Sequence, residues 1–201
     1  MSRIVSERAG KTDQVVLLPS SLEDPTKAPP GLYRIGLVST CLSIFAFFSA
    51  LVIAYVWRSR TPPFWRPIVL PDVLWVSTSL ILASSVTFEI ARRVFRRGMH
   101  RLASHLVMIT ACLGAAFLAC QLTAWRRLVE EGAYLTQNPH SSFFYLFTGL
   151  HALHLIGGMV VMAYILLGRN KRRELMDVVA YYWHFLGVLW LALFEVLRTV
   201  S

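Results

Sequence analysis

The 201-residue chain is 56% hydrophobic and only 15% charged, and its mean hydropathy is +0.55. Soluble domains carry about a quarter charged residues, so this chain lacks the polar surface that covers a water-soluble globule. The formal net charge of +9 does not indicate nucleic-acid binding, because the basic residues form short clusters between apolar runs, as in membrane proteins, and no readout module is present.

The first 31 residues are the most polar part of the chain. They contain several prolines among serine and charged side chains. Their apolar patch at 15–18 is too short for the hydrophobic region of a signal peptide. This composition predicts a flexible polar cytoplasmic tail at 1–31, followed by one transmembrane domain at 32–201.

Five apolar runs follow the tail, and each is long enough to cross a bilayer. A helix rises 1.5 Å per residue and crosses a hydrocarbon core of roughly 30 Å in about 20 residues. Backbone groups in lipid must pair internally, and barrel-type alternating segments are absent. The sequence therefore predicts an all-α, polytopic transmembrane bundle of five helices. The predicted spans are about 33–57, 71–95, 102–125, 141–167 and 178–197.

The distribution of basic residues predicts the orientation. The loops after the second and fourth spans, together with the end of the second span, carry nine arginines and lysines, against five in the loops after the first and third. Positively charged short loops stay on the cytoplasmic side. The N-terminus is thus expected in the cytoplasm and the C-terminus in the periplasm.

Ionisable side chains inside apolar spans are energetically costly, so each is expected to have a polar partner or a function. Glu89 lies near the cytoplasmic end of the second span, and Arg92 and Arg93 follow at i+3 and i+4 on the same helix face. The spacing predicts a carboxylate that pairs with its own helix near the membrane interface.

Three histidines lie deeper in the last two spans. Counted from Ser141, His151 and His154 are roughly 15 and 20 Å into the fourth span, and the fifth span carries His184. Antiparallel packing of these spans predicts a buried polar cluster of the three histidines with Glu89. Interhelical hydrogen bonds are the favoured role. Metal or haem binding stays open on spacing alone, since a histidine pair at i, i+3 is a loose signal.

No catalytic constellation is visible. The sequence lacks the serine-hydrolase elbow, the zinc-protease helix, the phosphate-binding loop and the copper-binding CxxxC loop. Its three cysteines, at 41, 112 and 120, all lie inside apolar spans and form no CxxC pair, so a disulfide framework is not expected.

Two long motifs in the last two spans resemble subunit III of haem-copper (cytochrome c) oxidases. The segment 141–158, SSFFYLFTGLHALHLIGG, resembles the family pattern S-x-F-F-x-x-T-G-x-H-x-x-H-x-x-x-G. The segment 181–190, YYWHFLGVLW, resembles Y-W-H-F-x-D-x-x-W. The segment 84–93 is similar to the family's S-S/G-x-T helix with its basic end. Five spans match the short bacterial form of the family, and the resemblance extends over about 32–197.

This resemblance implies a subunit without its own haem or copper. Such a subunit packs against subunit I, which holds haems and copper together with subunit II, in a proton-pumping complex of the bacterial inner membrane that reduces oxygen to water in aerobic respiration. A small subunit IV and bound phospholipid are further expected partners, and no nucleic acid is. His151, His154 and His184 are then expected to be structural. Contacts with lipid headgroups are expected for a set of arginines: Arg92, Arg93, Arg96, Arg97, Arg172 and Arg173.

The sequence departs from the family pattern at three places. The first span has Ser39–Leu42 where the family has a glutamate, and Glu89 is a candidate substitute for that carboxylate. Gly187 stands where the family has an aspartate after W-H-F, and Asp177 stands in place of a glutamate. Three alternatives remain: a subunit III-like component of a quinol oxidase or nitric oxide reductase, an independent haem-binding cytochrome, and a small transporter.

Overall fold

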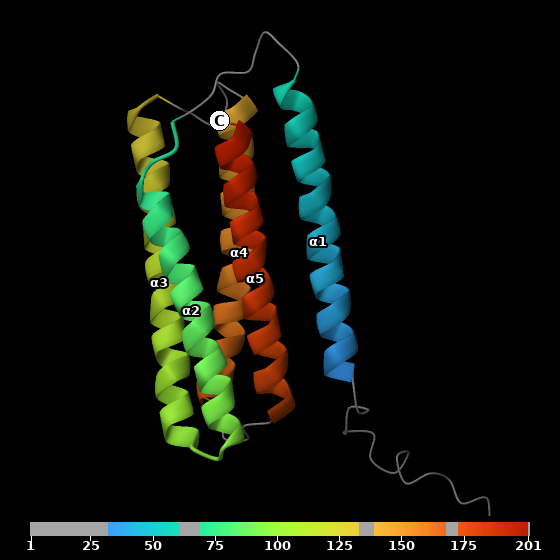
Figure 1. Cartoon of the computed structure of the whole chain (residues 1–201), viewed down its shortest axis with the longest axis vertical. Coiled ribbons are helices and arrows are strands. Elements are labelled where there is room, and N and C mark those ends of the chain that lie inside the picture. Colours follow the sequence, from blue (N-terminus) through green and yellow to red (C-terminus); the bar gives the residue numbers. More distant parts are fainter. Residues whose placement is uncertain (1–31, 61–68, 133–138, 168–172, 201) are drawn as a thin grey trace, which may run out of the picture. The chain divides into compact units, whose positions relative to one another are not determined.

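The described residues of the computed structural model, 32–60, 69–132, 139–167 and 173–200, form five α-helices (Figure 1). Each helix is long and apolar enough to cross a membrane, so the predicted all-α, five-helix membrane fold is confirmed. The tail at 1–31 lies outside the described residues, and the orientation of the termini stays a prediction. The helices are α1 (Leu32–Ser59), α2 (Val73–Arg96), α3 (His100–Glu130), α4 (Pro139–Leu167) and α5 (Arg173–Val200).

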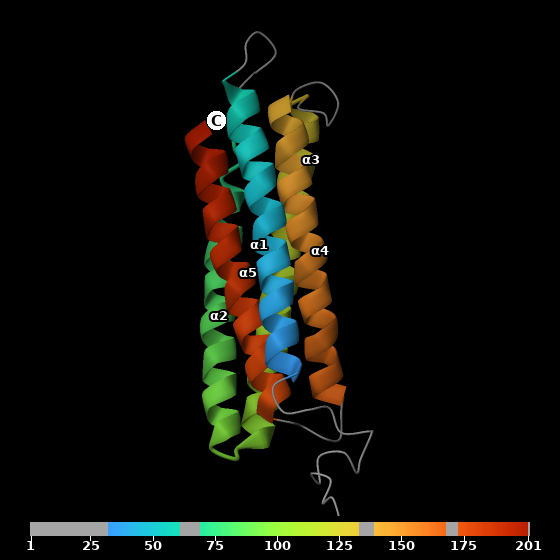
Figure 2. The ribbon, with the colours of Figure 1, turned by 90° about the vertical axis from the view of Figure 1, so that its right-hand side faces the viewer.

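Helices α2 to α5 close into a ring of four. Helix α2 packs against both α3 and α5, and α4 packs against the same two neighbours. The two views show these helices running along nearly the same direction (Figure 2). Helices α2 and α3 are joined by a short turn in which Gly98 has φ of 82°, a left-handed conformation that glycine adopts without steric cost. The ring therefore has one tightly fixed antiparallel hairpin.

Helix α5 supplies the largest buried side chains of the ring. Half of the residues in its apolar window are buried, and Trp183 and Trp190 are fully buried. Glycines let the neighbouring helices reach Trp183. An added Cβ would lie 2.9 Å from its ring at Gly114 and 3.3 Å from it at Gly158. Small residues thus permit the close helix approach that packing in membranes requires.

Indole groups also link the helices by hydrogen bonds. On α5, the Trp183 Nε1–H donates to Ser84 Oγ of α2 at 3.0 Å, and the Trp190 Nε1–H donates to Thr78 Oγ1 of α2 at 3.0 Å. The Trp125 Nε1–H of α3 donates to the hydroxyl of α4 Thr148 at 2.9 Å. Lipid offers these donors no partner, so short hydroxyl side chains on the facing helix satisfy them.

Helix α1 contacts α4 through aromatic rings. The Tyr55 ring lies 5.4 Å from that of Phe143 and 5.5 Å from that of Phe147, and Phe48 lies 5.8 Å from the His154 ring, all between centroids. Only 11% of the apolar window of α1 is buried. Most of its apolar surface is therefore available to lipid or to a partner.

Candidate functional site: an ion-paired cluster between α2 and α5

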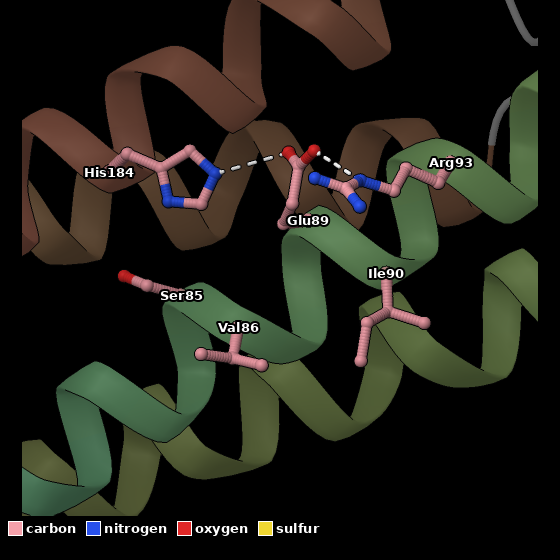
Figure 3. Close-up of a pocket in the computed structure, with 6 residues that line it drawn as sticks. All are labelled: Ser85, Val86, Glu89, Ile90, Arg93 and His184. Atoms are coloured by element: carbon pink, nitrogen blue, oxygen red, sulfur yellow. Dashed lines mark hydrogen bonds and ion pairs between the residues drawn. The ribbon is translucent and has the colours of Figure 1, made fainter.

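The centre of the candidate site is Glu89, three-quarters of the way along α2. Its carboxylate accepts two hydrogen bonds from Arg92, at 2.8 and 2.7 Å, and one from Arg93 Nε at 2.8 Å. The i+3 and i+4 spacing places both guanidinium groups on the face of Glu89. From α5, His184 Nε2 approaches the same carboxylate at 3.5 Å (Figure 3). Glu89 therefore connects its own helix to α5.

Asp177 on α5 continues the network. Its carboxylate lies 2.8 Å from an Arg96 nitrogen and 3.4 Å from an Arg92 nitrogen. The Arg92 guanidinium also lies 5.3 Å from the centre of the Tyr181 ring on α5, within reach of a cation–π interaction. Arg92 thus contacts the carboxylates of Glu89 and Asp177 and the aromatic ring of Tyr181. These contacts link α2 to α5 over about two helical turns.

Burial separates the strong contacts of this network from the weak ones. The side chains of Glu89 and Asp177 are 23% exposed and that of Arg92 is 14% exposed, whereas Arg93 and Arg96 are 70% and 51% exposed. Ion pairs among exposed side chains contribute little, because water and salt screen them. The Glu89–Arg92 pair therefore dominates the energetics of the network.

An open pocket of about 390 Å³ adjoins the network. Five α2 residues line it, and His184 of α5 completes its wall (Figure 3). The α2 residues are Ser85, Val86, Glu89, Ile90 and Arg93. The pocket combines apolar walls with a carboxylate at one side, so it suits an apolar chain or side chain that carries a hydrogen-bond donor. Gly187 lies beside it, where an added Cβ would be 3.0 Å from Ser85 Oγ.

The structure brings together only part of the set predicted from the sequence. Glu89, Arg92, Arg93 and His184 meet, but His154 bonds elsewhere. Its Nδ1–H donates to the Leu150 carbonyl of its own helix at 2.7 Å, and its ring packs against Phe48.

His151 lies about 60° around the α4 axis from His154 and points into the ring of four helices. It is fully buried, with the rings of Phe117 and Trp190 at 5.8 and 5.3 Å. The histidine pair at i, i+3 therefore contacts different neighbours and does not converge on one ligand.

The arginines expected to meet lipid headgroups also divide into two groups. Arg92, Arg93 and Arg96 are held in the ion-paired network. Arg97, at the end of α2, and Arg173, at the start of α5, are exposed. Arg172 lies outside the described residues.

Asp177 and Tyr181 were not among the site residues proposed from the sequence. A signal for them does exist, because Asp177, Tyr181 and His184 follow one another at i, i+4 and i+7, the spacing of one helix face. The sequence offers no comparable sign that this face of α5 meets Glu89 rather than His154.

Among the described residues, no three histidine, cysteine or acidic side chains are arranged so that they could hold a metal ion. Cys41, Cys112 and Cys120 are free thiols. Within the described residues, the ion-pair partners of Glu89 lie on α2 and α5, so no contact with α1 supports its proposed substitution for a first-span carboxylate.

The helices and the site define a multi-pass helical membrane protein in which charged residues join two helices. Its sequence matches the family model for cytochrome c oxidase subunit III over residues 26–199. "Probable cytochrome c oxidase subunit 3" of Nocardia farcinica is 30% identical over 182 residues, or 85% of this chain and 89% of that protein. "Cytochrome bo(3) ubiquinol oxidase subunit 3" of Pseudomonas aeruginosa is 31% identical, over 80% and 79% of the two chains. "Quinol oxidase subunit 3" of Bacillus subtilis is 33% identical, over 63% and 68%.

The chain belongs to the subunit III family of haem-copper oxidases. It is thus a subunit of a terminal oxidase complex, and members of this family carry no cofactor of their own.

Proposed function

We propose that this chain is the non-catalytic, cofactor-free subunit III of a proton-pumping cytochrome c oxidase in a bacterial inner membrane. In this role it packs against subunit I, beside subunit II and a small subunit IV. The haems and copper of subunits I and II carry electrons from cytochrome c to oxygen. The family match over residues 26–199 is the observation that carries the proposal. The extent of the match to the Nocardia farcinica protein, 85% and 89% of the two chains, adds support.

Its contribution to the complex is assembly, phospholipid binding and sustained turnover of subunit I. The ion-paired network supports the first role, because it fixes α2 against α5 and so presents a defined helix surface. Arg97 and Arg173 support the second role. Both are exposed cations at the α2–α3 turn end of the bundle, where anionic headgroups would gain from them.

Purification of the tagged chain from its native membranes tests the proposal. We expect subunits I and II to co-purify, and the complex to show haem absorption and to consume oxygen with reduced cytochrome c. The isolated chain is expected to show no Soret band. Co-purification without a haem-bearing subunit would contradict the proposal, and a Soret band in the isolated chain would establish a haem-binding cytochrome instead.

A quinol oxidase is the second candidate, and the two quinol oxidase relatives, 31% and 33% identical, favour it. The same preparation distinguishes the two donors. Oxygen consumption with a reduced quinol but not with reduced cytochrome c would assign the chain to the quinol type. Nitric oxide consumption without oxygen consumption would assign it to a nitric oxide reductase.

The structural role of the histidines has its own test. We expect His154→Leu and His184→Leu to weaken assembly or shorten turnover while the haem spectrum of the complex stays unchanged. His105→Leu is the matched control, because His105 is exposed on α3. Loss of a haem band in the His154 or the His184 variant would contradict the structural role.

A further inference from the structure

One layer of the four-helix core holds polar side chains from all four helices. Gln121 Nε2 of α3 donates to Ser77 Oγ of α2 at 3.0 Å, and Trp190 of α5 donates to Thr78 of α2 at 3.0 Å. His151 of α4 lies against the Trp190 ring at 5.3 Å. These side chains are at most 7% exposed.

The packing register places Gln121 and His151 at the same level. Helices α3 and α4 are antiparallel, and Trp125 of α3 bonds Thr148 of α4. Gln121 comes one turn before Trp125, so it faces the turn that follows Thr148, which contains His151. His151 also contacts Phe117, which lies one turn before Gln121 on α3. This contact is consistent with His151 and Gln121 lying at the same depth in the bundle.

Some buried polar atoms of this layer have no hydrogen-bond partner among its side chains. Within the described structure, Gln121 Oε1 and both ring nitrogens of His151 are buried without a hydrogen-bond partner. The hydroxyls of Ser77 and Thr78 both donate to the Leu74 carbonyl, so neither is left to donate to Gln121 Oε1. An interchange of the amide oxygen and nitrogen of Gln121 would still leave one end unpaired.

We propose that this layer binds an internal water molecule that bridges the Gln121 amide and a ring nitrogen of His151. Buried polar groups in proteins are paired, and where side chains do not pair them, ordered water does. Water both donates and accepts, so it serves a neutral imidazole and an amide oxygen at once. The aromatic neighbours of His151 offer no comparable partner. The histidine of the T-G-L-H segment thereby acquires a role independent of any metal and of the site at Glu89.

Two measurements test this water site. A map of the assembled oxidase at a resolution that shows ordered water is expected to contain a density peak within hydrogen-bond distance of both Gln121 and His151. A direct bond between the two side chains, or a layer without such a peak, would overturn the proposal.

The second measurement uses the full chain, labelled with ¹⁵N-histidine, in deuterated lipid. We expect a magnetisation-transfer signal from water to the His151 ring. This signal is expected to be lost in Gln121→Leu and kept in the control His105→Phe, which alters an exposed histidine of α3, the helix that also carries Gln121. Retention of the signal in Gln121→Leu, or its absence from the unmodified chain, would overturn the proposal. The unmodified chain decides the question even if Gln121→Leu fails to fold.

Discussion

Replacement of Glu89 by glutamine removes the charge at the centre of the α2–α5 network and keeps the shape of the side chain. The amide can accept one of the two Arg92 hydrogen bonds, but its NH₂ group opposes the other. Hydrogen bonds to charged groups contribute about 1.5–3 kcal/mol each and neutral ones about 1 kcal/mol. Arg92 is 14% exposed and keeps one bond to the amide oxygen and the 3.4 Å contact with Asp177, so we expect the free energy of unfolding to fall by about 2 kcal/mol.

A second ion pair of the same geometry provides the control. Glu195 accepts two hydrogen bonds from Arg198, at 3.0 and 2.7 Å, with the same i, i+3 spacing, but these side chains are 56% and 52% exposed. Glu195→Gln is therefore expected to change stability too little to measure.

Reversible denaturation of the full chain in mixed micelles, followed by tryptophan fluorescence, compares the two variants. A loss of about 2 kcal/mol corresponds to roughly thirty-fold in the unfolding equilibrium. Equal losses for Glu89→Gln and Glu195→Gln would refute the argument that burial, rather than pair geometry, sets the strength of this network.

Two further variants use the same denaturation assay. Gly158→Ala is expected to lower the free energy of unfolding by about 1–3 kcal/mol, because its Cβ would lie 3.3 Å from the Trp183 ring. The control Gly157→Ala meets nothing within 4 Å and is expected to be neutral or slightly stabilising. A larger loss of stability at Gly157 than at Gly158 would contradict the packing. Asp177→Asn is expected to lower the free energy of unfolding by about 1 kcal/mol, less than Glu89→Gln, because its closest partner Arg96 is 51% exposed and such pairs are screened by water. A larger loss of stability than that of Glu89→Gln would mean that Asp177 dominates the network.

The five spans were predictable because bilayer thickness imposes a length on each apolar run. The predicted second span, 71–95, and the helix Val73–Arg96 differ by two residues at one end and one at the other. The helix His100–Glu130 extends five residues beyond the predicted third span, 102–125. Hydropathy marks where lipid begins, but a helix continues past that point into the interface, where Arg126 and Arg127 are still helical.

Contacts within one helix were also predictable, and contacts between helices were less so. The pairing of Glu89 with Arg92 and Arg93 follows from the helix period alone. The choice of His184 rather than His154 as the second-helix partner depends on the rotation of α4 and α5 about their axes. Spacing along one helix does not contain that rotation, which depends on the packing between helices.

The different surroundings of His151 and His154 follow from the position of α4 between two kinds of neighbour. An i, i+3 pair spans about 60° around the helix axis at 3.6 residues per turn, which is enough to direct one ring into the core and the other toward α1. His151 meets Trp190 within the four-helix ring, and His154 meets Phe48 outside it. The T-G-L-H-A-L-H segment therefore supplies polar groups to two separate packing interfaces of α4. A substitution at one histidine should disturb only its own interface, and the loss of both should be close to additive.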